Sequence, residues 1–320
     1  MPEKDEKQMR TILAALLFLL PLCSCSYSDY QDNPELLNIV CTSFPAYDFS
    51  KNLSGDKAEI RLMIPPGSES HSFDPKPSDI IAIEQADIFI YGGGESDTWA
   101  KEALAALGTS PYTVSMCDII TPLEHNHNNT VSEHKHSDKH SHEFDEHVWT
   151  SPKNAVLICN EITKALINID AKNTDFYSAA SIKYTDKLLL LDERLRKISD
   201  NATNKLLIFG DRFPFRYLAK DYGFDYIAAF PGCAQITEPT AKTVAQLIDK
   251  VKTTNSSAIF YVEFSNRKIC DTVSEDTGAV PMLLHSCHNI TKSEFEQGIG
   301  YIELMNKNAD TLAKALNQGM

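Results

Sequence analysis

Four histidines in three segments carry side chains that could bind a transition metal. His71 lies in PPGSESHSFDPKPSD, between two proline-rich ends, His147 lies in FDEHVWTSP, and His285 and His288 lie in HSCH. Imidazole nitrogens mixed with carboxylate oxygens suit Zn²⁺, whereas Mn²⁺ favours more oxygen ligands. These residue types therefore predict a site for Zn²⁺, with Mn²⁺ as the less favoured ion.

Each segment also has an ordinary structural interpretation. His71 could be a solvated loop histidine, and His147 could be a helix-entry residue stabilised by the acids beside it. The HSCH segment could be core packing at a strand end, with Cys287 in a disulfide. The metal interpretation gains weight if all three segments fall at one edge of the fold, so the elements that carry them matter.

Apolar strand patterns alternate with helix patterns in both halves of the chain. This alternation is typical of parallel sheets with helices on both faces, so we expect two doubly wound α/β lobes. In the first half the predicted strands are 37–43, 58–64, 87–93 and 112–118, and the helices are 45–54, 77–86 and 96–107. In the second half the predicted strands are 205–210, 225–230, 258–265 and 280–286, and the helices are 214–222, 239–253, 266–277 and 300–317.

One long helix is predicted between the two series, over residues 172–200. No glycine or proline interrupts it, and its apolar residues recur at spacings of three and four: Tyr177, Ala180, Tyr184, Leu188, Leu191 and Leu195. We therefore expect an N-terminal lobe over 26–170, a rigid linking helix over 171–200 and a C-terminal lobe over 201–320. In such sheets ligands bind beyond the carboxyl ends of the strands, which is where the histidine segments fall. The metal site is accordingly expected in the cleft between the lobes.

Seven of the ten histidines lie in residues 119–147, which hold almost no apolar residues. A tract of this composition cannot fold by itself, but it can hold several metal ions weakly. It could be a solvated loop only. We favour a metal-collecting loop at the mouth of the cleft, because the tract leads directly into His147.

Composition limits the possible partners. The net charge of −14 and the pI near 5.1 argue against a nucleic-acid partner, which usually requires a basic face. The same charge suits a protein that attracts cations.

The first residues resemble an export signal. Lys4, Lys7 and Arg10 precede the apolar run at 12–22, which is too short to span a bilayer. The run ends in LCSC, so residues 1–25 predict a signal peptide with a lipobox and lipidation at Cys25. A simple secretory signal is the alternative. Either one predicts an extracytoplasmic protein, where disulfides are permitted, although the spacing of the cysteines does not reveal their pairing.

Five motifs resemble the solute-binding proteins of zinc and manganese ABC importers, the ZnuA-like and TroA-like family: PPGSESHSFDPKPSD, DEHVWTSPKNAV, RYLAKDYGF, FYVEFSNRKICDTVSEDTGA and GYIELMNKNADTLAKAL. The resemblance covers roughly 36–318. It implies a lipid-anchored monomer on the outer side of the cell membrane that captures Zn²⁺ for a membrane permease and its ATPase, without catalysing a reaction.

The resemblance also implies part of the ligand set. Family ligands carry over to His71 and His147, but the third falls at Gly210 and the usual C-terminal carboxylate falls near Ile299, which is apolar. The HSCH segment is the best substitute source, so we expect His288 and His285 to complete the site. Two carboxylates at strand ends, Asp211 and Glu263, are expected to support these histidines or to bind the metal occasionally.

Two other functions fit some of the same residues. A zinc hydrolase would need three ligands and an open water position, and the chain lacks the HExxH pattern of one large hydrolase class. A surface adhesin could carry these histidines incidentally.

Overall fold

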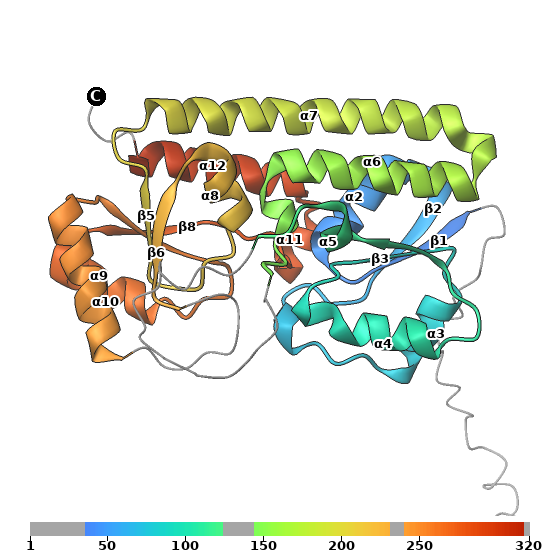
Figure 1. The fold of residues 1–320 in the computed structure, drawn as a ribbon, viewed down its shortest axis with the longest axis horizontal. Helices are drawn as coiled ribbons and strands as arrows, with labels where there is room; N and C mark the ends of the chain where they lie inside the picture. The colour runs from blue at the N-terminus through green and yellow to red at the C-terminus, as the bar shows by residue number, and fades with distance from the viewer. Residues whose placement is uncertain (1–35, 124–143, 231–239, 317–320) are drawn as a thin grey trace, which may run out of the picture. The chain divides into compact units, whose positions relative to one another are not determined.

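The computed structural model describes residues 36–123, 144–230 and 240–316. Within these residues the chain forms two α/β lobes, each built on a four-stranded parallel sheet (Figure 1). The predicted fold class is therefore confirmed.

The N-terminal sheet has the order β2-β1-β3-β4. Its strands are short, and the inner strands β1 and β3 are apolar and largely buried, whereas the edge strands β2 and β4 are only partly buried. The strands are β1 (Leu37–Cys41), β2 (Ala58–Leu62), β3 (Ile88–Tyr91) and β4 (Tyr112–Ser115). The helices of this lobe are α2 (Phe44–Ser54), α3 (Pro77–Glu84), α4 (Thr98–Ala106), α5 (Met116–Ile119) and α6 (Pro152–Ile169).

The C-terminal sheet repeats this arrangement in the order β6-β5-β7-β8. Its strands are β5 (Leu206–Phe209), β6 (Asp225–Ala228), β7 (Ala258–Tyr261) and β8 (Val280–Leu283). Its helices are α8 (Arg216–Tyr222), α9 (Ala241–Thr254), α10 (Lys268–Thr277), α11 (Lys292–Glu296) and α12 (Tyr301–Leu316). The short helix α11 was not predicted, and it begins at a capping box made by Thr291 and Glu294.

The long helix α7 (Thr174–Asn201) runs past both lobes (Figure 1). It packs against α6 and α2 of the first lobe and against α12 and α8 of the second. Five of the six predicted residues are buried along one face: Tyr177, Tyr184, Leu188, Leu191 and Leu195. The sixth, Ala180, is only partly buried, and its neighbour Ser181 is buried instead. One hydrophobic core includes residues of both lobes and of α7, among them Ile39 and Leu316. The core is therefore not divided at 170 or 201, and these lobe boundaries stay a prediction.

The strand that precedes HSCH is shorter than predicted. It ends at Leu283, and residues 284–290 leave the sheet as an irregular segment, which we call the HSCH loop. Side chains satisfy its backbone in place of a neighbouring strand: the Glu263 carboxylate accepts the Ser286 N–H at 2.7 Å, and Asn308 accepts the His285 N–H at 2.7 Å.

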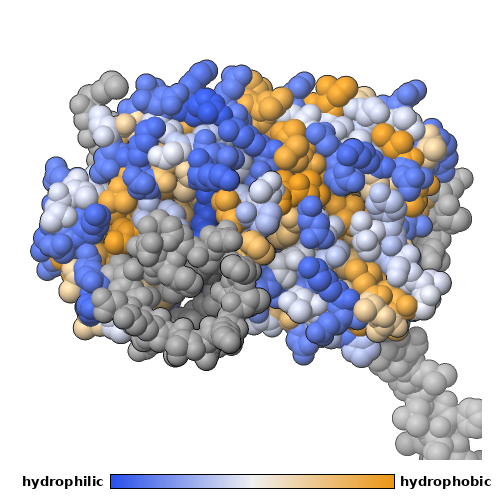
Figure 2. Space-filling view, in the orientation of Figure 1, coloured by the Kyte–Doolittle hydropathy of each residue, from blue (hydrophilic) through white to orange (hydrophobic). Residues whose placement is uncertain are grey.

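Cys287, which the structural interpretation of the HSCH segment placed in a disulfide, is a free thiol. Cys41, Cys117, Cys159, Cys270 and Cys287 are free thiols in the described part of the chain, and Cys159 is a buried core residue. The face in Figure 2 is mostly hydrophilic, with apolar side chains gathered over α6 and α7. Both helices carry exposed large apolar residues, Leu157 on α6 and Ile182 and Leu190 on α7. Among the described residues, no helix is both long and apolar enough to cross a bilayer.

Candidate metal centre

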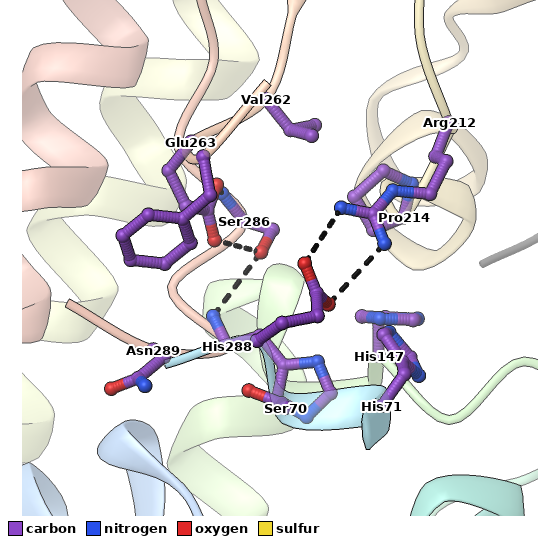
Figure 3. A pocket seen from close by; sticks show the side chains of 12 residues that line it. Ser70, His71, His147, Arg212, Pro214, Val262, Glu263, Ser286, His288 and Asn289 are labelled. Carbon is purple, nitrogen blue, oxygen red and sulfur yellow. Dashed lines mark hydrogen bonds and ion pairs between the residues drawn. The ribbon is translucent and has the colours of Figure 1, made fainter. Parts of the chain in front are cut away.

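Three histidines and one glutamate converge between the two lobes. Possible ligand atoms of His71, Glu146, His147 and His288 all lie within 4.8 Å of one another. The three imidazole rings form a triangle, with centroid separations of 5.8 Å between His71 and His147, 4.9 Å between His71 and His288, and 5.3 Å between His147 and His288. Figure 3 shows the three rings at the floor of the pocket.

His71 reaches the site from a short 3₁₀ turn, Ser70–Ser72, in the connection between β2 and α3. Its Nδ1 lies 3.4 Å from Oε1 of Glu146. Burial, and then the neighbouring His147, lower the pKa of His71 below its ordinary value. The imidazole is therefore neutral at pH 7, as a metal ligand must be.

His147 is held by the carboxylate two residues before it. Asp145 Oδ1 lies 2.9 Å from the ring Nδ1 of His147 and accepts the backbone N–H of the same residue at 2.9 Å. Burial opposes the charge on Asp145, but the hydrogen bonds and charge of His147, with Arg216 nearby, hold the pKa of Asp145 below its usual value. An ionised Asp145 accepts a hydrogen bond from the Nδ1–H group of His147. The proton is therefore on Nδ1, and Nε2 keeps a lone pair that could bind a metal.

Glu146 enters the site because the backbone opposite it carries no side chain. A Cβ at Gly94 would lie 2.2 Å from the Cβ of Glu146, so only glycine leaves room there. The Oε2 atom accepts the backbone N–H of Ser96 at 2.9 Å, and Oε1 is the atom that faces His71. Glu146 was not among the ligands predicted from the sequence, because the acids before His147 were treated only as partners of the helix entry.

His288 is the candidate ligand that comes from the second lobe. It is buried, and its ring lies 4.9 Å from that of Trp149. The backbone turns at Cys287, where φ is +61°, and the Ser286 hydroxyl accepts the His288 N–H at 3.2 Å. Burial, and then His71 and His147, lower the pKa of His288 well below its ordinary value. This imidazole is also neutral at pH 7.

His285, the fourth predicted ligand, does not join these donors. Its Nδ1 accepts the Cys287 N–H at 3.0 Å, and the ring lines a different cavity. Asp211 and Glu263 are also outside the donor group. Glu263 supports the site indirectly, since it holds the backbone of the HSCH loop at Ser286, as described above.

The two positions at which the family ligands would fall contribute no donor, as the residue types predict. A Cβ at Gly210 would lie 2.5 Å from Cys270 Sγ, so the backbone is pressed against α10 with no space for a side chain. Ile299 is partly buried against the hydrophobic core.

Arg212, two residues after Gly210, lines the site from the second lobe (Figure 3). Its guanidinium nitrogens donate to both carboxylate oxygens of Glu69 at 3.3 Å, and Glu69 lies in the first lobe two residues before His71. An interlobe ion pair therefore lies beside the metal donors. The Arg212 charge also contributes to lowering the pKa values of His71 and His288.

Three imidazole nitrogens and one carboxylate oxygen form a four-donor set suited to Zn²⁺. The cavity beside them is only about 20 Å³, close to the volume that one water needs. The predicted collecting loop, apart from its ends, lies outside the described residues.

A family model for the periplasmic component A of zinc-uptake complexes matches residues 39–315. The chain belongs to this family. The high-affinity zinc uptake system protein ZnuA of Bacillus subtilis is 31% identical over 308 residues, which cover 95% of this chain and 96% of that protein. The zinc-binding lipoprotein AdcA of Streptococcus pneumoniae is 29% identical over 313 residues, which cover 98% of this chain but 62% of that protein.

Solved structures agree with this family. One of them is the Zn(II)-bound ZnuA-like domain of AdcA from Streptococcus pneumoniae, which superimposes with a TM-score of 0.75 at 27% identity. The superposition covers 88% of this chain and 100% of that domain. The resemblance stated from the five motifs is thus confirmed. The conserved framework is the pair of parallel-sheet lobes with the long helix α7.

Proposed function

We propose that this protein captures one Zn²⁺ ion outside the cytoplasm and delivers it to the permease and ATPase of an ABC importer. The observation that carries the proposal is the convergence of His71, His147, His288 and Glu146 on one point. The histidines and the glutamate come from both lobes, so the ion would be enclosed between them. Membership in the zinc-uptake family supports the same function.

The donor set favours binding without catalysis. Catalytic zinc sites have three protein ligands and an open water position, whereas four protein donors leave no such position. The cavity of about 20 Å³ also leaves no room for an organic substrate. We therefore infer that the protein is not an enzyme and that Zn²⁺ is its cargo. Zinc-loaded protein that hydrolysed peptide or ester substrates would contradict this inference.

We also propose that the mature protein is a monomer held at the membrane by lipid on Cys25, which lies outside the described residues. Replacement of this residue, Cys25→Ala, should move the protein from the membrane fraction to the soluble extracytoplasmic fraction. An unchanged distribution would show that the chain is retained by other means.

Metal titration tests the function most simply. The apo protein should bind one Zn²⁺ tightly in competition with a chelator and should bind Mn²⁺ more weakly. His71→Ala and His288→Ala should each lose tight binding, whereas the exposed control Lys314→Ala should retain it. An apo protein that gains no thermal stability from Zn²⁺ would instead support an adhesin with incidental histidines.

Growth under zinc limitation tests delivery. A strain that lacks the gene should require more zinc, and the wild-type chain should restore growth. If His288→Ala restored growth equally well, zinc capture at this site would not be the function.

A further inference from the structure

A second cavity lies on the C-terminal lobe, between β8, α11 and α12. Its volume is about 220 Å³, roughly ten times that of the cavity at the metal donors. Met282, Leu283 and Leu304 provide an apolar wall. The polar residues that line it include His285, the predicted ligand that the metal site does not use.

The imidazole of His285 is fixed by its surroundings. Asn308 accepts the backbone N–H of His285 at 2.7 Å and donates to its carbonyl oxygen at 2.8 Å. The backbone N–H of Cys287 donates to the ring Nδ1 at 3.0 Å, which the left-handed conformation of Cys287 allows. A ring nitrogen that accepts a hydrogen bond carries no proton, so the neutral ring carries its proton on Nε2.

The Nε2–H group of His285 is a hydrogen-bond donor without an acceptor among the described residues. His285 is only 3% exposed, and Nε2 has no hydrogen-bond partner among the described residues. A buried donor without a partner is costly, so such groups in folded proteins are normally satisfied by protein, water or ligand. The ring lines the cavity while Nε2 itself is closed off from solvent, so an acceptor in the cavity would complete its hydrogen bonding after a small shift of the side chains around it.

The charges around the cavity favour a single negative charge. Lys307 and Lys314 are seven residues apart on α12, so they lie on one face of that helix, and both line the cavity. The Nζ atom of Lys307 is also 3.5 Å from Oε1 of Glu303, with which it forms an ion pair. The Glu294 carboxylate lines the cavity too, where it accepts hydrogen bonds from the Thr291 N–H and hydroxyl. This carboxylate would repel a doubly charged phosphate more than a monoanion.

We propose that this cavity binds a small aliphatic monocarboxylate, whose carboxylate accepts the His285 Nε2–H and faces Lys314 while its alkyl chain contacts the apolar wall. The site is separate from the metal donors and does not depend on the zinc-capture proposal. It gives the C-terminal lobe a second ligand, of a different chemical class.

Nuclear magnetic resonance of the histidine side chains in the full apo chain tests this proposal, with butanoate as the probe and butanamide as its uncharged control. Butanoate should shift the His285 Nε2–H resonance and saturate with a dissociation constant on the order of 1 mM, as expected for so small a ligand. Butanamide should bind at least about tenfold more weakly, because it lacks the charge.

Three variants locate the effect. Lys314→Glu reverses an exposed charge at the cavity and should weaken butanoate binding about tenfold or more. His285→Leu should abolish saturable binding, whereas His71→Ala should leave it unchanged while it loses zinc. No saturation in the wild type, equal binding of butanamide, or unchanged binding in Lys314→Glu would each overturn the proposal.

Discussion

Asp145 determines which nitrogen of His147 faces the metal donors. Its ionised carboxylate holds a proton on Nδ1 and leaves the lone pair on Nε2. Residues that orient a metal-binding histidine in this way usually contribute a factor of roughly 10–100 to metal affinity. We therefore expect metal binding to be sensitive to Asp145, which lies outside the group of donors.

The change Asp145→Asn tests this role. The amide retains the shape of the side chain but loses the charge that fixes the Nδ1–H tautomer, so Zn²⁺ affinity should fall by about 10–100-fold. A chelator-competition titration measures the change. The exposed acid Asp118, altered to Asn, is the control and should have no effect. Equal affinity in Asp145→Asn and wild type would contradict the assigned tautomer.

The buried histidines also predict how stability depends on pH. Burial lowers the pKa of His71 and lowers that of His288 well below the ordinary value of 6.5. As the pH falls below about 6.5, the unfolded chain binds protons that the folded chain does not, so the free energy of unfolding decreases.

His71 and His288 should thus reduce the stability of the apo protein in urea at pH 5.5 relative to pH 7.5, whereas the buried Asp97, whose pKa burial raises to about 6, contributes in the opposite direction. His288→Asn should reduce this dependence, because one of the two groups is removed. The same lowered pKa values mean that Zn²⁺ need not displace a proton from these rings at neutral pH. A pH dependence of stability that was the same in His288→Asn and in the wild type would contradict the lowered pKa of His288.

At the scale of the elements, two connecting segments place the carboxylate and the arginine of the site. The turn after β3 contains Gly94, whose missing side chain admits Glu146. The turn after β5 carries Arg212, which reaches across to Glu69. The sheets therefore position the site through the short segments that follow their strands.

Gly94→Ala should displace Glu146, since the added Cβ would lie 2.2 Å from the Glu146 Cβ. We expect weaker Zn²⁺ binding and a loss of about 1–3 kcal/mol in the free energy of unfolding from overpacking. Gly108→Ala is the matched control, because an added Cβ there meets nothing within 4 Å. If both variants bound zinc like the wild type, the placement of Glu146 would be wrong.

The carboxylate of Glu69 should neutralise the positive charge of Arg212 beside the Zn²⁺ site. Glu69→Gln leaves the Arg212 charge without its carboxylate, so Zn²⁺ affinity should fall on the order of tenfold. The double variant Glu69→Gln with Arg212→Met removes both charges and should recover most of the loss. Titrations at low and high salt check the electrostatic origin, since salt should reduce the effect of Glu69→Gln. If the double variant bound Zn²⁺ no more tightly than Glu69→Gln alone, an electrostatic origin of the loss would be excluded.

The sheets and α7 were predictable because apolar periodicity reports burial directly. The approach of His71, His147 and His288 to one another was also predictable, since their segments were expected at one edge of the fold, and that they bind a metal stays a prediction. The sequence did not predict that His288 would join the other donors while His285 would not. This difference depends on the turn at Cys287 and on Asn308, which is more than 20 residues away along the chain. Glu146 was not among the predicted candidates for a similar reason: its place depends on Gly94, which is 52 residues earlier in the chain.

At the scale of the whole described molecule, the lobes are joined at the site as well as along α7. Asn289 of the HSCH loop donates to the carbonyl oxygens of Pro65 and Ser68 at 2.8 Å each. The Gly67 N–H donates to Ile290 at 2.7 Å, and Trp149 Nε1–H donates to Ser286 at 2.9 Å. These bonds tie the two lobes at the level of the ligands, so we expect zinc to be released by small shifts of the loops.

Crystallography of the zinc-loaded protein, with anomalous diffraction measured on both sides of the zinc absorption edge, tests the central claim most directly. The account predicts one strong zinc peak per chain, bonded to His71, His147 and His288 nitrogens at about 2.0–2.1 Å and to a Glu146 oxygen at about 2.0–2.2 Å. A zinc ion bound with His288 or His71 unattached would contradict the claim that both lobes supply ligands to one ion.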